Sequence, residues 1–154
     1  MANLTKSTKP VKSKEIKRDW HLFDAKDKVL GRFATEIIRY LTGKNKVNYV
    51  PYLDMGDFVV VVNAKHIVLT GKKEQTKTYS RYSGYPGGLK TISFAVLKEK
   101  NPAEIIKQAV SKMLPKNKLR VKRLTRLFIF AEERHPHKDK FEIRNPKTKT
   151  NSND

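Results

Sequence analysis

The stretch that decides the fold is Phe58-Val59-Val60-Val61-Val62, in which four β-branched valines follow one phenylalanine without a polar break. An unbroken apolar run of this length is typical of a strand that is covered on both faces, as in a parallel sheet. Residues 20–25 are short and aromatic, and residues 127–131 are apolar. We expect all three segments to be buried strands, with residues 67–69 as a further short strand closed by Gly71.

Helical spacing appears between these strands. Apolar residues recur at i, i+3 and i+4 from Leu30 to Leu41, which predicts a helix that ends at Gly43. Asn101, Pro102 and Glu104 predict the start of a second long helix, which Pro115 ends. Residues 93–97 favour a short helix. This order of elements predicts an α/β domain with a largely parallel sheet of about four strands.

Length and charge restrict the class of protein. The chain has 154 residues, which fits one domain, and 34 Lys and Arg against 15 Asp and Glu give a net charge of +19. Solubility alone needs a net charge of only about 2–8 in a small domain. We therefore expect a polyanionic partner, with nucleic acid first, because each neutralised phosphate releases counterions. The absence of Cys excludes disulfides and thiolate ligands, and the longest apolar run is too short to span a membrane.

Composition divides the chain into three parts. We expect residues 1–17 to be a basic, flexible N-terminal extension that orders on a polyanion, and an organellar presequence is the alternative. Residues 18–137 form the single α/β RNA-binding domain in this interpretation. Residues 138–154 form a polar C-terminal tail.

Motifs for catalysis are weak. Asp54 and Asp57 could hold a metal for nuclease chemistry, but no third carboxylate lies near them in the sequence. His135 and His137 offer two imidazoles, whereas zinc usually takes four ligands. We expect no catalytic residue, metal, cofactor or small-molecule substrate, and we interpret the two histidines as structural or RNA-stacking residues.

The basic, glycine-rich segment 71–90 is the first candidate RNA contact, because long loops in compact domains tend to be functional. Its tyrosines can stack on splayed bases while its cations meet phosphates, and its glycines allow close backbone approach. The alternative is that the tyrosines pin the loop to the core. The candidate residues here are Lys72, Lys73, Tyr79, Arg81, Tyr82, Gly84, Tyr85, Gly87, Gly88 and Lys90.

A second candidate is segment 116–126, which holds six cations and no acidic residue. Cations without a local acidic partner indicate phosphate contacts, and a solvated face is the alternative. The candidate residues are Lys116, Lys118, Arg120, Lys122, Arg123 and Arg126.

Seven short strings, in order and in register, resemble the family of ribosomal protein thirteen of the bacterial large subunit. The resemblance covers residues 17–137. Its strings include Leu30-Gly31-Arg32-Phe33-Ala34-Thr35, Thr70-Gly71-Lys72-Lys73, Gly84-Tyr85-Pro86-Gly87-Gly88-Leu89-Lys90, Met113-Leu114-Pro115-Lys116 and His135-Pro136-His137.

The resemblance implies a three-layer α/β/α domain with a four-stranded, mostly parallel sheet. It also implies a structural role in the cytoplasmic large ribosomal subunit: binding its rRNA, supporting early assembly and contacting neighbouring ribosomal proteins. An organellar ribosome is the alternative location, and some members also bind messenger RNA. Lys44, Lys46, His135 and His137 join the expected RNA contacts through this resemblance. A free-standing RNA regulator and a nuclease using Asp54 and Asp57 remain as alternative functions.

Overall fold

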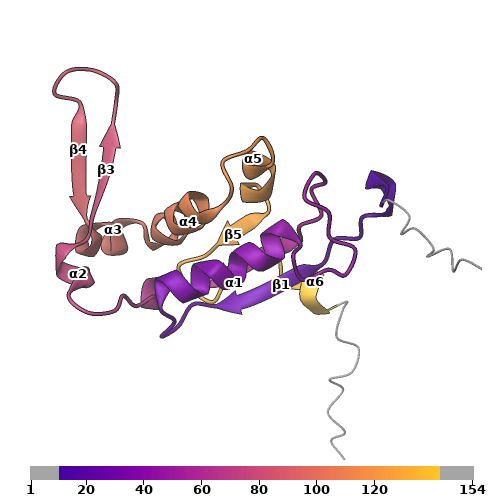
Figure 1. Cartoon of the computed structure of the whole chain (residues 1–154). Coiled ribbons are helices and arrows are strands. Elements are labelled where there is room, and N and C mark those ends of the chain that lie inside the picture. Colours follow the sequence, from indigo (N-terminus) through magenta and orange to yellow (C-terminus); the bar gives the residue numbers. More distant parts are fainter. Residues whose placement is uncertain (1–10, 143–154) are drawn as a thin grey trace, which may run out of the picture.

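A computed structural model describes residues 11–142 of the chain. Three strands form its parallel sheet in the order β1-β2-β5, with β1 at Trp20–Asp24, β2 at Phe58–Val62 and β5 at Leu127–Ile129 (Figure 1). The valine run is the central strand, and Val59, Val60 and Val61 are each 0% exposed. The three predicted strands are thus confirmed, and the position of β2 between two neighbours explains why the run has no polar residue.

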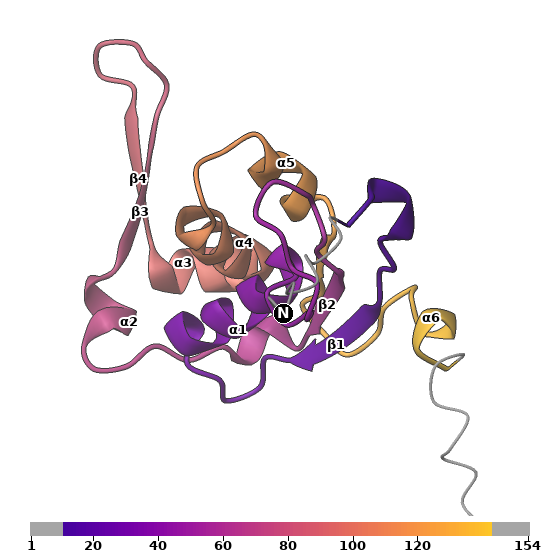
Figure 2. The same cartoon turned by 45° about the vertical axis from the view of Figure 1, so that its right-hand side comes forward.

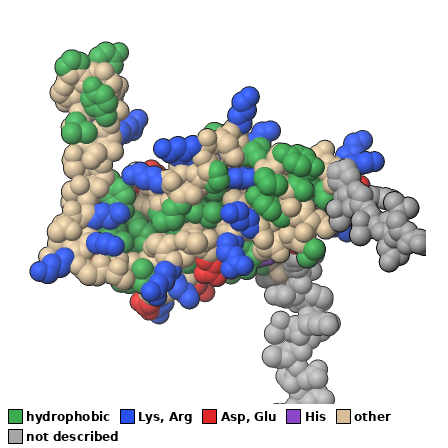
Figure 3. Space-filling view, in the orientation of Figure 1, with side chains coloured by type: hydrophobic (Ala, Val, Ile, Leu, Met, Phe, Trp, Pro, Cys, Tyr) green, Lys and Arg blue, Asp and Glu red, His purple; other side chains and the backbone are tan. Residues whose placement is uncertain are grey.

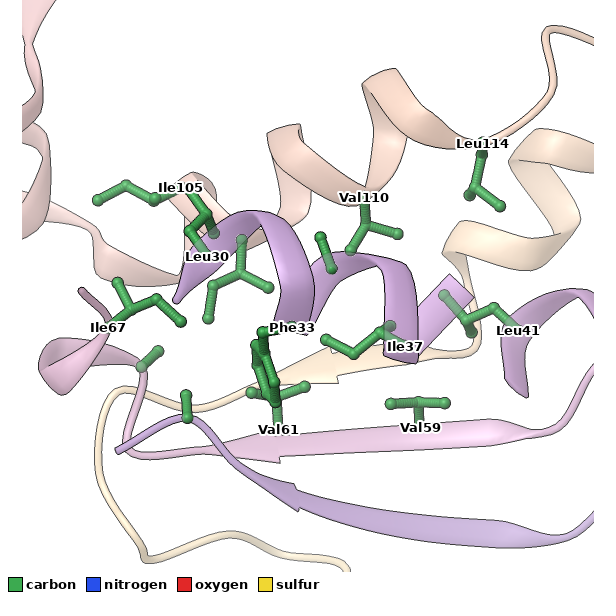
Figure 4. Close-up of a cluster of buried hydrophobic side chains, with 14 of the residues drawn as sticks. Leu30, Phe33, Ile37, Leu41, Val59, Val61, Ile67, Ile105, Val110 and Leu114 are labelled. Carbon is green, nitrogen blue, oxygen red and sulfur yellow. The ribbon is translucent and has the colours of Figure 1, made fainter. Parts of the chain in front are cut away.

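Two long helices cover one face of the sheet. α1 (Leu30–Thr42) and α4 (Pro102–Met113) pack against each other and against β2 and β5. Figure 4 shows Phe33, Ile37 and Leu41 of α1 pointing toward Val59 and Val61. Gly43 ends α1 in the left-handed region (φ 80°), as predicted, and its N–H donates to the Tyr40 carbonyl at 3.0 Å.

Aromatic side chains cover the other face. The rings of Trp20 and Phe58 stack with centroids 4.4 Å apart, and the His137 ring lies 5.2 Å from Trp20 and 4.7 Å from Phe128. The short helix α6 (Asp139–Glu142) lies beside β1 and adds the Phe141 ring, edge-on to Trp20. Of the two histidines predicted as structural or RNA-stacking residues, His137 belongs to this aromatic cluster, and the His135 ring lies 5.9 Å from the Phe130 ring.

The expectation of about four strands in the parallel sheet is met only in part. Residues 67–69 form no strand: Val68 makes a single parallel bridge to Val29. The chain turns sharply after β2, because Asn63 takes a left-handed conformation (φ 58°) and the 3-10 helix η2 (Ala64–His66) follows. This turn lets the next segment touch the start of α1 but not run along a neighbouring strand.

A β-hairpin replaces the loop expected between residues 71 and 90. After the short helix α2 (Lys73–Thr76), strands β3 (Thr78–Tyr82) and β4 (Leu89–Ser93) pair in antiparallel fashion, and α3 (Phe94–Lys100) follows. The hairpin projects from the body of the molecule in both views (Figures 1 and 2). The 3-10 helix η1 (Ser13–Glu15) lies near the N-terminal end of the described chain. The short helix α5 (Leu119–Leu124) lies in the basic segment 116–126, between α4 and β5.

Most of the two predicted extensions, 1–17 and 138–154, lies outside the described residues 11–142. Within residues 11–142, none of the helices has both the length and the apolar character that crossing a membrane requires.

Candidate nucleic-acid interface

The projecting hairpin carries positive charge with no counter-charge of its own. Residues 77–93 contain Lys77, Arg81 and Lys90 and no Asp or Glu. Arg81 and Lys90 lie directly opposite each other across the two strands, and both are exposed. Like charges in directly opposite positions destabilise a strand pair. A polyanion bound at this face would remove that repulsion.

The tip of the hairpin has a defined turn. The Gly88 N–H donates to the Tyr85 carbonyl at 2.9 Å, and Pro86 and Gly87 occupy the two central positions. Gly87 has φ 70°, which a type II turn requires at its third residue. A Cβ on Gly88 would lie 2.0 Å from the Ser83 hydroxyl oxygen, so this position has no room for a side chain. Gly84 also has a positive φ (92°), so all three glycines set the backbone conformation of the tip.

Tyr79 has a structural role, which was the alternative to stacking on bases. It packs against the hydrophobic core at the base of the hairpin, and burial raises the pKa of its hydroxyl. Lys77 Nζ lies 5.5 Å from the centre of its ring. Tyr79 therefore pins the hairpin to the core, whereas Tyr82 and Tyr85 are exposed.

The basic segment 116–126 presents only part of its charge to solvent. Lys116, Lys118 and Lys122 are exposed, before and along α5. Arg120 is half-buried and donates to the Ser111 hydroxyl at 2.7 Å. Figure 3 shows Lys and Arg side chains on this side of the body as well as on the hairpin stem.

Arg123 and Arg126 are buried and share an acidic partner. Arg126 donates to both Asp54 carboxylate oxygens at 2.6 Å, and Arg123 Nε lies 3.8 Å from Asp54 Oδ1. Asp54 lies 72 residues from Arg126 in the chain, so no local pattern reveals this pairing. The two arginine side chains therefore lie in the interior of the domain, where they balance Asp54. We exclude both arginines from the RNA contacts that we propose.

Lys46 is half-buried and is likewise held by groups of the domain itself. Its ammonium group lies 2.5 Å from Asp57 Oδ1 and donates to the Lys17 carbonyl at 2.6 Å. His21 Nε2 lies 3.2 Å from Asp57 Oδ2. Burial alone would raise the pKa of Asp57, but hydrogen bonds from His21 and Lys46 outweigh it and hold this pKa below its ordinary value. Lys46 therefore balances a buried carboxylate, whereas Lys44, Lys72 and Lys73 are exposed.

Comparison with known proteins identifies the family of the chain. The family described as ribosomal protein L13 has a sequence model that matches residues 18–136, well over half of the chain. The chain belongs to the ribosomal protein L13 family. The resemblance found in the sequence is thereby confirmed.

Relatives match over most of their length. The large ribosomal subunit protein uL13 of Pelobacter propionicus is 54% identical over 130 residues, which cover 84% of this chain and 92% of that protein. The protein of the same name from Geobacter sulfurreducens is 50% identical over 143 residues, or 93% and 97% of the two chains. The one from Nostoc is 52% identical over 122 residues, or 79% and 81%. A ribosomal protein of this family is a structural component rather than an enzyme.

The nuclease alternative loses its two carboxylates. Asp54 is held by Arg126 and Arg123, and Asp57 by Lys46 and His21. Within residues 11–142, no three His, Asp or Glu side chains gather as metal ligands would. In this chain the two carboxylates act as counter-charges for cations that are buried or half-buried.

The hairpin was the main feature that sequence reasoning missed. The Pro86-Gly87 dipeptide between its strands is a turn signal that could have indicated it. The strands themselves show almost no apolar alternation, because most of their side chains are exposed. The role of Asp54, in contrast, depends on a distant contact that no such signal reveals.

Proposed function

We propose that this chain is a structural constituent of the large ribosomal subunit, where it binds the large-subunit rRNA and supports early assembly. The observation that carries the proposal is the set of uL13 relatives, which are about 50% identical over most of both chains and are named as large-subunit proteins. The exposed cations of the hairpin and of segment 116–126 supply the chemistry. Neighbouring ribosomal proteins are its other partners.

The proposed RNA contacts are the predicted residues that are exposed or shape the hairpin tip. Exposure supports these residues as contacts. The core packing of Tyr79 and the ion pairs of Lys46, Arg123 and Arg126 support structural roles for those four side chains instead. The proposed contacts are Lys44, Lys72, Lys73, Arg81, Tyr82, Gly84, Tyr85, Gly87, Gly88, Lys90, Lys116, Lys118 and Lys122, with Arg120, His135 and His137 in the second rank because they are half-buried.

The finer architecture is part of the same proposal. We take residues 18–137 as the RNA-binding domain, with residues 1–17 and 138–154 as extensions. A three-layer α/β/α arrangement is supported by α1 and α4 on one face and α6 beside the other.

Sedimentation of the tagged full chain from cell lysate tests this function. We expect the protein to stay with the large subunit through a high-salt wash, because embedded contacts resist exchange with counterions. Release into the soluble fraction as salt rises would instead indicate a generic polyanion binder. In that case a free-standing regulator of RNA becomes the better explanation.

Neutralising segment 116–126 is expected to change how binding depends on salt. Replacing Lys116, Lys118 and Lys122 with Gln should leave folding intact, because all three side chains are exposed. Each lost phosphate contact should flatten the slope of log K against log salt by about 0.7–0.9. Titration of purified large-subunit rRNA with the variant measures this slope.

The matched control replaces Lys26, Lys28 and Lys100 with Gln, since these lysines are also exposed but lie outside both cationic segments. We expect the control to keep the slope of the unmodified chain. An unchanged slope in the first variant would mean that segment 116–126 is a solvated face. Equal flattening in both variants would mean that no localised site exists.

A further inference from the structure

The hairpin separates its side chains onto two faces. Arg81 lies opposite Lys90 on one face, and Tyr82 lies opposite Leu89 on the other, because successive side chains of a strand point to opposite sides. Tyr82 is 63% exposed and Leu89 is 62% exposed. One end of the hairpin therefore carries a cationic face and an apolar face back to back.

Tyr85 lies in the turn at the free end of the hairpin, next in the chain to the Tyr82 end of β3. It is 74% exposed, and Figure 3 shows hydrophobic side chains gathered at the free end of the hairpin, far from the body. Large apolar side chains gathered at one projecting end, rather than scattered singly over a surface, make this end a candidate interaction site. The remaining question is which kind of partner fits it.

We propose that the hairpin tip takes up unpaired RNA bases, in a loop, bulge or junction rather than in a continuous helix. This inference rests on the proposed function, and it names the kind of RNA structure that this part of the interface selects. Tyr82 and Tyr85 stack on splayed bases, while Arg81 and Lys90 meet the phosphates beside them.

The geometry of RNA favours this partner over a regular duplex. A continuous A-form helix keeps its bases stacked, and its major groove is too deep and narrow for side chains to read. The apolar tip would find no exposed base face there. Unpaired bases, in contrast, present faces on which aromatic side chains stack with little dependence on sequence.

Charge favours RNA over an apolar pocket on a neighbouring protein. The cations Arg81 and Lys90 stand directly behind the apolar face, and residues 77–93 contain no acidic residue. An apolar pocket would leave this repelling pair without counter-charge, whereas an unpaired RNA strand supplies bases and phosphates together.

The tip is built before it binds. The Tyr85–Gly88 hydrogen bond closes the turn, and the close packing of Gly88 on Ser83 fixes the chain on its other side. A preset turn loses less conformational freedom on binding than a flexible loop does. The hairpin is therefore suited to insertion between RNA segments.

Ultraviolet crosslinking of purified large subunits that contain the full chain tests the proposal. We expect nucleotide adducts on Tyr82 or Tyr85 by mass spectrometry, and reverse-transcription stops at nucleotides outside continuous helices. Adducts only to base-paired nucleotides, adducts only to protein, or no adduct at the tip would overturn the inference. The proposed function fails separately, if the chain is absent from the large-subunit particles.

A pair of variants measures the effect on affinity. Replacing Tyr82 and Tyr85 together with Ser should weaken binding to purified large-subunit rRNA by about tenfold or more, with the salt slope unchanged. The control is Tyr52→Ser, at a tyrosine that is 65% exposed but lies outside the hairpin. Unchanged affinity in the double variant, with loss of the protein from assembled subunits, would assign the tip to a protein neighbour and overturn the inference.

Discussion

Replacing Gly56 with alanine is expected to cost the domain much of its stability. A Cβ at this position would lie 1.8 Å from the Leu41 carbonyl oxygen and 2.9 Å from Arg126 Nη2. The loop cannot easily move away, because the next N–H, that of Asp57, donates to the Tyr40 carbonyl at 3.0 Å. We expect a loss at or above the upper end of the roughly 1–3 kcal/mol that overpacking usually costs.

Gly31→Ala is the matched control for this change. A Cβ on Gly31 would meet no atom within 4 Å, and Gly31 lies in the first turn of α1. Alanine here should stabilise the chain by about 0.4–1 kcal/mol, because it restricts the unfolded chain and favours the helix. Urea unfolding followed by the fluorescence of Trp20, the single tryptophan, measures both variants. Equal midpoints for the two variants would contradict the packing described around Gly56.

Replacing Asp54 with alanine is expected to lower the free energy of unfolding by a similar amount, but for an electrostatic reason. The change removes the partner of two cations whose side chains are only 8% exposed in Arg126 and 2% exposed in Arg123. Breaking a buried ion pair by removing one partner costs about 3–5 kcal/mol, because the remaining charge stays buried. The urea midpoint of the variant measures this loss.

Two comparisons separate burial from charge. Lys65→Ala breaks the exposed Lys65–Glu132 pair, whose atoms lie 2.7 Å apart, and should leave the midpoint unchanged within error. The double variant Asp54→Leu with Arg126→Met removes both partners of the closer pair and should recover part of the loss. A single Asp54→Ala variant as stable as Lys65→Ala would show that the buried pair contributes little to folding.

Local patterns predict the helices and strands of the body well, because those patterns follow from burial of neighbouring residues. The run ending at Val62 and the helix ending at Gly43 are two such cases. The sequence did not predict the hairpin, because most side chains of its strands are exposed to solvent. An apolar periodicity is therefore nearly absent from residues 78–93. Residues 67–69 have the composition of a strand, but the turn at Asn63 takes them away from the sheet.

The candidate site was harder to predict than the fold. Counting charges in segment 116–126 identifies the exposed lysines but cannot distinguish them from Arg123 and Arg126, whose partner Asp54 lies far away in the chain. The sequence around Tyr79 is compatible both with stacking on RNA bases and with packing on the core. Only the observed packing against the core decides between these two roles. The contacts of the exposed residues with RNA stay predictions.

The strand order β1-β2-β5 has a consequence for the chain before it meets RNA. Both β1 and β5 are edge strands, and open edges invite pairing between copies and aggregation. β5 is only three residues long, which limits the template that this edge offers. A net charge of +19 adds mutual repulsion between copies. The same positive charge that favours binding to a polyanion thus also opposes self-association of newly made copies before they bind RNA.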